Sequence, residues 1–238
     1  MFKLELRKSF KGNTALYIGI ITLLSFILGF ILPVGIDKVK HLPISEYLFS
    51  TYTVITQFGF LLFAFVISLF FNKEFSEKTI LFYRINGINS LRFFLNKVII
   101  LFLESVIFVS IYTFGVSIFY KDFSKSLFFI LIISIIILQY ILIIGFISML
   151  FSNILFSLAI SILYWITSII LVQMGGIFKY IALFDASNSL YNKVSTFFNT
   201  GYFPISDVFI ISLFIITFFV TTVVFSKIIQ NRWLKIGI

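Results

Sequence analysis

Two ionisable residues stand close together in a part of the sequence that is otherwise apolar. Glu104 interrupts an apolar run, and Lys97 precedes it by seven positions. On a helix this spacing places both side chains on one face, about 10 Å apart along the axis. An ionisable side chain inside a membrane span indicates function by default. Near the interface it can instead pair with a neighbour or extend its charge to water. A Lys97–Glu104 ion pair is therefore our hypothesis, beside simple exposure of Glu104.

A second group of charges flanks a short apolar run within residues 72–97. This run predicts a helix of two to three turns over residues 74–88. Asn86-Gly87 can end it with a left-handed cap, and Asn89-Ser90 can begin the next helix. An apolar face outside the membrane must pack against the protein's own helices or against a partner. The candidate partner contacts are Glu74, Glu77, Lys78, Thr79, Phe82, Tyr83 and Arg84.

The remaining residue types argue against chemistry on this chain. There is no cysteine, and the single histidine, His41, lies beside Leu42-Pro43 outside the apolar runs. No Glu-Glu pair falls within an apolar run, and the histidine that a serine protease would need lies outside these runs, so an intramembrane protease is disfavoured. The phosphate-binding sequence G-x-x-x-x-G-K-[ST] is also absent. The sequence thus predicts no catalytic residue, no metal site and no cofactor on the chain itself.

Composition then identifies the class of protein. Apolar residues make up 61% of the 238 residues and charged residues 11%, whereas soluble domains have about 45–50% and 25%. Six apolar runs reach the length of about 20 residues that crosses a bilayer as a helix. They cover residues 15–34, 47–71, 98–120, 126–151, 154–178 and 208–226. The fourth and fifth must be separate spans with a turn at Ser152-Asn153, because one helix would be about 80 Å long.

The segments outside these runs complete an all-α membrane protein with a single transmembrane domain over residues 1–238. Residues 1–14 mix apolar and basic side chains and predict an amphipathic helix on the inner leaflet. The same cations can also act as a topology determinant. The first run is too long for a signal peptide and no Ala-x-Ala site follows it, so we expect it to be retained. The polar outer segment 175–206 predicts short interfacial or re-entrant helices.

The net charge is +9. The basic residues lie in short segments beside apolar runs, so they indicate the orientation of the chain in the membrane rather than nucleic-acid binding. With the N-terminus inside, twelve of the eighteen basic residues fall on the inner side and six on the outer side. This distribution predicts a multi-pass protein of the cytoplasmic membrane with both termini in the cytoplasm. Abundant Lys, Ile, Phe and Asn are typical of a low-GC bacterium.

This organisation resembles the permease subunits of the type-2 ABC exporters (ABC-2 permeases). In that family an amphipathic helix precedes six spans, a coupling helix lies between the second and third spans, and short outer helices precede the sixth. The inner segment is also similar to the family's loose pattern. It offers Glu74, then Glu77-Lys78-Thr79, the apolar residues 80–85, Ile88-Asn89-Ser90-Leu91-Arg92 and Lys97. The turn lacks the family's usual proline.

The resemblance implies that ATP and Mg bind to separate ATPase subunits that push on the coupling helix, residues 74–88. It also implies two ATPases and a second permease copy or a related permease in each transporter. The expected cargo is an amphipathic or hydrophobic molecule such as an antimicrobial or cytolytic peptide, exported or defended against. Hydrophobic drugs and lipid-linked glycans are alternative cargos. A stand-alone channel, scaffold or immunity protein is the alternative that does not involve an ATPase.

Overall fold

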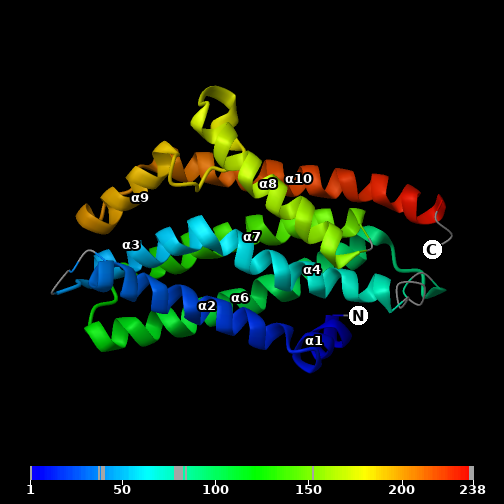
Figure 1. Ribbon diagram of the computed structural model, residues 1–238, viewed down its shortest axis with the longest axis horizontal. Helices are drawn as coiled ribbons and strands as arrows, with labels where there is room; N and C mark the ends of the chain where they lie inside the picture. The colour runs from blue at the N-terminus through cyan, green and yellow to red at the C-terminus, as the bar shows by residue number, and fades with distance from the viewer. Residues whose placement is uncertain are drawn as a thin grey trace.

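The computed structural model is an elongated bundle of helices that run along one common axis (Figure 1). It describes residues 2–36, 38, 41–77, 83, 85–151 and 153–235, with the backbone alone for Ser76 and residues 226–235. No strand occurs in these ranges. The prediction of an all-α protein is confirmed.

Within the described ranges, six helical segments are long and apolar enough to cross a membrane, as the sequence predicts. Their bounds are Thr14–Ile36, Ile44–Phe75, Ser90–Tyr120, Ser126–Leu150, Ile154–Gln173 and Ile205–Phe225. The first consists of α2 (Thr14–Ile31) and the π-turn η1 (Leu32–Ile36). The second consists of α3 (Ile44–Val54), the π-turn η2 (Ile55–Gly59) and α4 (Phe60–Ser76). The other four are α6 (Ser90–Tyr120), α7 (Ser126–Leu150), α8 (Ile154–Gln173) and α10 (Ile205–Lys235).

Among the described residues, three short helices lie outside the spans. The first is α1 (Phe2–Lys11), which joins α2 through Gly12 and Asn13. The other two are the 3₁₀ turn η3 (Gly176–Tyr180) and α9 (Ser189–Thr200), both in the segment for which short helices are expected. Helix α1, the last turns of α4, the first turns of α6 and the end of α10 gather at one end of the bundle (Figure 1). We call this the terminal end, and the end near α9 the distal end.

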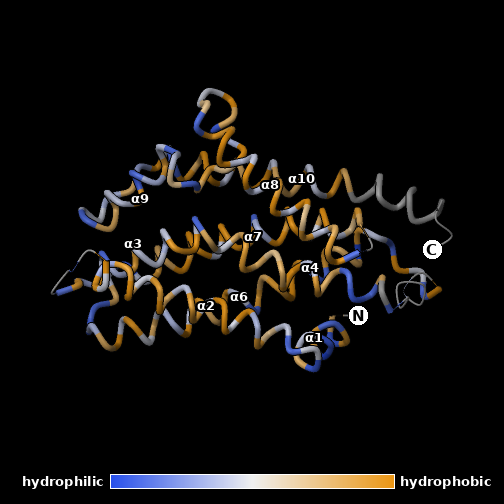
Figure 2. The backbone as a smooth tube through the Cα atoms, in the orientation of Figure 1, coloured by the Kyte–Doolittle hydropathy of each residue, from blue (hydrophilic) through white to orange (hydrophobic). Residues whose placement is uncertain are grey.

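Helix α7 occupies the centre of the bundle because it is apolar on every side. Its mean hydropathy of 3.1 is the highest of the six spans, and it packs against α4, α6, α8 and α10. A helix without a polar face belongs in a core or in lipid. By contrast, α8 and α10 lie at the edge and leave most of their apolar side chains partly or fully exposed. Hydrophilic residues gather at the terminal end, in α1 and the last turns of α4, and recur along α9 (Figure 2).

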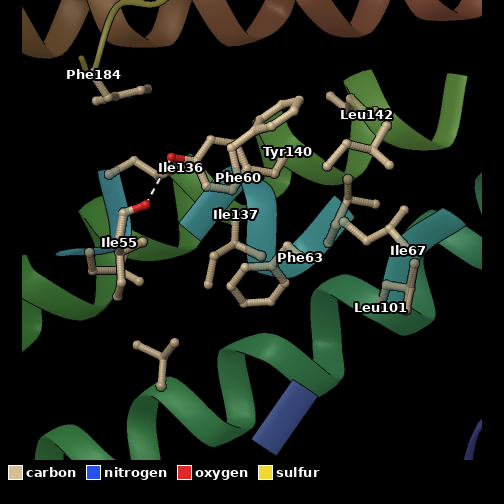
Figure 3. Close-up of a cluster of buried hydrophobic side chains, with 14 of the residues drawn as sticks. Ile55, Phe60, Phe63, Ile67, Leu101, Ile136, Ile137, Tyr140, Leu142 and Phe184 are labelled. Atoms are coloured by element: carbon tan, nitrogen blue, oxygen red, sulfur yellow. Dashed lines mark hydrogen bonds between the residues drawn. The ribbon is translucent and has the colours of Figure 1, made fainter. Parts of the chain in front are cut away.

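The π-turn η2 bends the second span where it crosses α7. A π-turn shifts backbone carbonyls out of the regular helical pattern, and in the membrane each such group needs a partner. The Tyr140 hydroxyl of α7 supplies one, since it donates to the Ile55 carbonyl oxygen at 3.1 Å (Figure 3). Phe60 and Phe63 pack around this bond against the same face of α7. No sequence pattern noted above predicts this irregular turn.

Helix boundaries near the two predicted breaks agree with their local residues. Asn153 caps α8, because its side chain accepts a bond from the Leu155 amide at 2.9 Å, so the fourth and fifth spans are separate. Gly87 has φ +71°, and the Ile88 amide donates to the Tyr83 carbonyl at 3.0 Å. This six-to-one bond with glycine in the left-handed region is a Schellman cap. Helix α6 then begins at Ser90, although Asn89 makes no side-chain cap bond.

The predicted separate helix over residues 74–88 needs one correction. Helix α4 continues without a break to Ser76, so Glu74 belongs to the second span and not to a separate helix. The apolar residues of the span are followed directly by charged residues. Charged residues do not end a helix, so α4 continues through them to Ser76. Residues 78–82 and 84, in the middle of the predicted helix, lie outside the described residues.

Candidate functional site

The main polar feature of the bundle is a group of buried charges at the terminal end. Lys97, on α6, has only 1% of its surface exposed. Its ammonium nitrogen lies 3.3 Å from Oε2 of Glu5 and 3.6 Å from Oε1 of Glu74, and it donates to the Phe70 carbonyl oxygen at 2.9 Å. The nitrogen also lies 3.9 Å from the centroid of the Phe70 ring. Three helices thus meet at one ammonium group.

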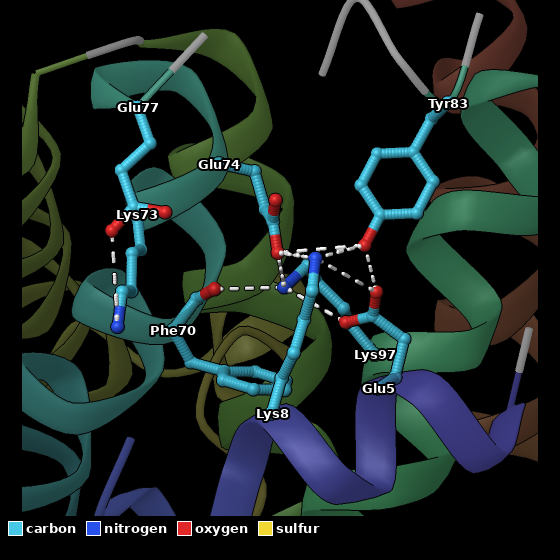
Figure 4. Close-up of polar contacts among 8 residues, drawn as sticks. All are labelled: Glu5, Lys8, Phe70, Lys73, Glu74, Glu77, Tyr83 and Lys97. Atoms are coloured by element: carbon cyan, nitrogen blue, oxygen red, sulfur yellow. Dashed lines mark hydrogen bonds and ion pairs between the residues drawn. The ribbon is translucent and has the colours of Figure 1, made fainter. Parts of the chain in front are cut away.

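Lys8 and Tyr83 complete the group. The Lys8 ammonium donates to Oε1 of Glu74 at 2.9 Å and to the Tyr83 hydroxyl at 2.6 Å. The Tyr83 hydroxyl donates in turn to Oε1 of Glu5. These contacts join α1, α4, α6 and the segment between α4 and α6 (Figure 4). We call Glu5, Lys8, Glu74, Tyr83 and Lys97 the charge cluster.

The charge cluster is electrically balanced. Two ammonium groups face two carboxylates, and Lys8 alone is partly exposed among the four. Buried charges are tolerated when they are paired and hydrogen-bonded, whereas removal of one partner is strongly destabilising. Burial, and then the hydrogen bond with Glu5, raise the pKa of Tyr83 above its ordinary value. The phenol therefore remains a neutral donor at physiological pH.

A second polar contact joins α1 and α6, one turn further along α1 than Glu5. The Ser9 hydroxyl donates to Oε2 of Glu104 at 2.8 Å, and both side chains are buried. Glu5 and Ser9 are four residues apart and so lie on one face of α1. This face is polar and buried against α6, while Phe2 and Phe10 of the same helix are exposed. Helix α1 is therefore held to the bundle by polar contacts and leaves apolar side chains outside.

The structure gives Lys97 and Glu104 other partners than the predicted ion pair. Lys97 binds Glu5 and Glu74, and Glu104 binds Ser9. No contact between Lys97 and Glu104 falls within ion-pair distance. The physical reason is that α1 packs against α6 and supplies polar groups to both residues. The pairing hypothesis considered one helix alone and could not include a partner from the chain's beginning.

The structure describes three of the seven predicted partner contacts. Glu74 and Tyr83 are buried in the charge cluster, so they contact the protein's own helices. Glu77 is exposed at the end of α4, where its carboxylate lies 3.9 Å from the Lys73 ammonium. The other four, Lys78, Thr79, Phe82 and Arg84, lie outside the described residues.

Sequence reasoning missed Glu5, Lys8 and Ser9 as members of the site. Glu5 is the one acidic residue among the first 36 and stands within a strongly basic helix. Together with the four-residue spacing to Ser9, this isolated carboxylate was a usable indication that α1 has a polar partner. Within the described ranges no group of three His, Cys, Asp or Glu residues is placed to hold a metal ion.

Hollows with mainly apolar walls lie beside α8 in the described part of the chain. One of about 30 Å³ lies near Gln139, Tyr164 and Asp185, and has room for about one water molecule. Two grooves of about 270 and 440 Å³ open beside α8 and α10 and share Tyr164 and Phe218. Their walls are almost entirely apolar, and α7 contributes to the 270 Å³ groove. Because both grooves open beside helices at the edge of the bundle, lipid chains can cover them.

Comparison with known proteins now adds to this geometry. The model of the peptide export permease protein YydJ family matches residues 2–238. A Bacillus subtilis (strain 168) protein named "Probable peptide export permease protein YydJ" is 40% identical, in an alignment that covers 99% of this chain and all of that protein. The chain belongs to the YydJ family of peptide export permeases. No solved structure matches it.

Membership of the YydJ family confirms the prediction of a transporter permease in the membrane. It favours the permease over the stand-alone channel, scaffold or immunity protein, because the match covers almost the entire chain. Since the match includes α1, the charge cluster lies wholly within the part of the chain that this family shares.

Proposed function

We propose that this chain is the permease subunit of an ATP-binding cassette exporter that carries a peptide out of the cell. The family match over residues 2–238 is the observation that carries this proposal. The chain itself contains no phosphate-binding loop. ATP and Mg therefore bind to a separate ATPase subunit, and the permease supplies the path through the membrane.

In this proposal the terminal end of the bundle faces the cytoplasm. Of the twelve Lys and Arg residues that the sequence predicts on the inner side, the ten in the described part of the chain belong to segments at this end, as expected for the cytoplasmic side of a membrane protein. Helix α1, the last turns of α4, the first turns of α6 and the end of α10 lie there together (Figure 1). An ATPase in the cytoplasm therefore has access to the connection and to α1.

The ATPase contact is proposed to be the segment 72–97, with residues 74–88 at its centre. Ile85 is 84% exposed, and an exposed apolar side chain outside the spans suits an interface anchor. Glu77 and Arg92 are exposed on either side of it. Behind this surface, Glu74 and Tyr83 are fixed in the charge cluster, so displacement of the segment pulls on α1, α4 and α6 together.

Each transporter is proposed to contain two permease copies, or this chain and a related permease, with two ATPase subunits. This stoichiometry rests on the resemblance to the type-2 ABC exporters, in which two ATPases close on ATP. The cargo is proposed to be an amphipathic peptide, in keeping with the family's description.

Replacement of an exposed side chain tests the coupling surface without disturbing the charge cluster. Ile85→Asp should weaken the ATPase complex about 30-fold, the loss expected for a buried interface anchor. The permease is purified from cells that also make the ATPase, and bound ATPase and peptide export are measured. Ile177→Asp is the matched control. Ile177 is 81% exposed and lies in η3, which follows the fifth span and is far from the terminal end. Equal ATPase recovery from both variants would show that Ile85 is not an anchor.

A further inference from the structure

A hollow of about 310 Å³ opens at the terminal end between α1 and the last turns of α4. Its lining combines three apolar residues with five cations and two acids. They are Leu4, Arg7, Lys8, Lys11, Gly12, Thr14, Leu69, Phe70, Lys73, Glu74, Glu77 and Lys97. We call this hollow the cationic pocket. Its volume corresponds to about ten water molecules in the liquid, which accommodates a phosphate group with a glycerol unit.

The charges of the pocket do not cancel. Lys8 and Lys97 are balanced by Glu5 and Glu74 in the charge cluster, and Lys73 faces Glu77 at 3.9 Å. Five cations against these three acids leave a surplus of two, carried by Arg7 and Lys11. Neither of these two makes an ion pair in the described part of the chain. The pocket therefore has the charge to attract an anion.

Helical geometry brings the surplus charges to one side of α1. Leu4, Arg7, Lys8 and Lys11 follow the spacing that places residues on a single helix face, which here borders the pocket. Lys73 approaches the same place from α4. Its ammonium nitrogen lies 3.7 Å from the position that a Cβ atom on Gly12 would occupy. The cations thus come from three helices, with Lys97 on α6, and surround a common space.

The pocket lies at the edge of the apolar part of the bundle. The first span begins at Thr14, and the second ends at Phe75, so both spans meet polar residues at this level. Leu4 is exposed beside the cations, as are Phe2 and Phe10 on the rest of α1. An amphiphile can therefore place its charged group among the cations while its acyl chains continue along the exposed apolar side chains. Basic pockets between transmembrane helices are typical sites for anionic headgroups.

We propose that the cationic pocket binds the phosphate headgroup of an anionic phospholipid, with Arg7 and Lys11 as its main contacts. The bound lipid joins α1 to α4 from the membrane side, while the charge cluster joins them from within. This inference concerns the lipid requirement of the permease and does not depend on where the ATPase binds.

Native mass spectrometry of the purified permease in neutral detergent tests the proposal, with phosphatidylglycerol as the probe and phosphatidylcholine for comparison. Wild type should retain phosphatidylglycerol at least tenfold more tightly. The double variant Arg7→Gln/Lys11→Gln should bind it about 30-fold more weakly, the loss expected for two cations near a membrane surface. The matched control Lys3→Gln/Arg92→Gln removes two exposed cations outside the pocket and should keep its affinity within threefold.

Several outcomes would overturn the proposal. Equal losses in the two double variants would mean that general surface charge attracts the lipid. Equally tight binding of glycerol phosphate in water would identify a soluble phosphate as the ligand. Normal lipid binding with loss of the ATPase would make the pocket a protein contact. If the double variant does not fold, Lys11→Gln alone should weaken phosphatidylglycerol binding about fivefold, and an unchanged affinity would exclude the site.

Discussion

The two ends of the bundle hold a short helix in place by different interactions. At the terminal end, α1 is attached by a buried ammonium–carboxylate network and by the Ser9–Glu104 hydrogen bond. At the distal end, α9 is attached by apolar side chains four residues apart, Leu190, Val194 and Phe198. Aromatic rings extend this contact, including Phe128 and Phe197 with centroids 3.7 Å apart. One partly exposed ion pair, between Lys193 and Asp207, supplements it.

This difference bears on how each end can move. A balanced buried ion network has one good arrangement, and loss of one member leaves a charge without compensation. Apolar packing depends on volume and is less directional, so small displacements of α9 cost little. The terminal end is therefore suited to transmit a displacement between helices. The distal end is suited to adjust its shape beside the outer part of the bundle.

The largest expected effect comes from removing the ammonium group that joins the three helices. Lys97→Met leaves Glu5 and Glu74 with less positive charge in a buried site, and should lower the free energy of unfolding by about 3–5 kcal/mol. Unfolding by denaturing detergent, followed by circular dichroism, measures this change. Lys193→Met is the distal counterpart. Lys193 is about half exposed, and the first turn of α10 still stabilises the buried Asp207 carboxylate, so the loss should be smaller, about 1–2 kcal/mol. Equal losses would remove the distinction between the two ends.

The next effect is a coupling between members of the charge cluster. Glu5→Gln and Lys97→Met each unbalance the network, but together they leave Lys8 facing Glu74. The double variant should therefore lose about 0.5–3 kcal/mol less than the sum of the two single losses. The same unfolding measurement on all four proteins gives the coupling. Strictly additive losses would contradict the ion network that the contacts describe.

The smallest expected effect concerns the pair that the sequence suggests. Because Lys97 and Glu104 have different partners, Lys97→Met and Glu104→Gln should reduce stability additively, within about 0.5 kcal/mol. Glu104→Gln retains a carbonyl oxygen for the Ser9 hydroxyl and should by itself be mild. A coupling of more than about 1 kcal/mol between the two would support the direct ion pair and weaken the assignment of Lys97 to the charge cluster.

Much of the fold follows from local sequence. Apolar run length predicts the six spans, and Gly87 and Asn153 mark helix boundaries through their own backbone preferences. Such features depend on residues within one or two turns. The continuation of α4 through Glu74 to Ser76 was not predicted, because the prediction took the charged residues as the end of the span. Charged residues do not by themselves end a helix.

The site itself was harder to predict, because its partners are far apart in the chain. Lys97 has a plausible neighbour in Glu104 on its own helix, but Glu5 approaches it from α1. That approach depends on the packing of α1 against α6, which sequence periodicity does not specify. Likewise, Tyr140 stabilises the π-turn at Ile55 through a contact between two spans. Partners of this kind become visible only when the helices are assembled.

The orientation of these two ends in the membrane tests the central claim most directly. The native chain has no cysteine, so single cysteines can be introduced at Glu77 on the terminal end and at Tyr202 on the distal end, both exposed. A membrane-impermeant maleimide should label Tyr202→Cys in intact cells, and Glu77→Cys only after the membrane is permeabilised. Labelling of Glu77→Cys in intact cells, with Tyr202→Cys protected, would place the charge cluster outside the cell and contradict its proposed coupling to an ATPase.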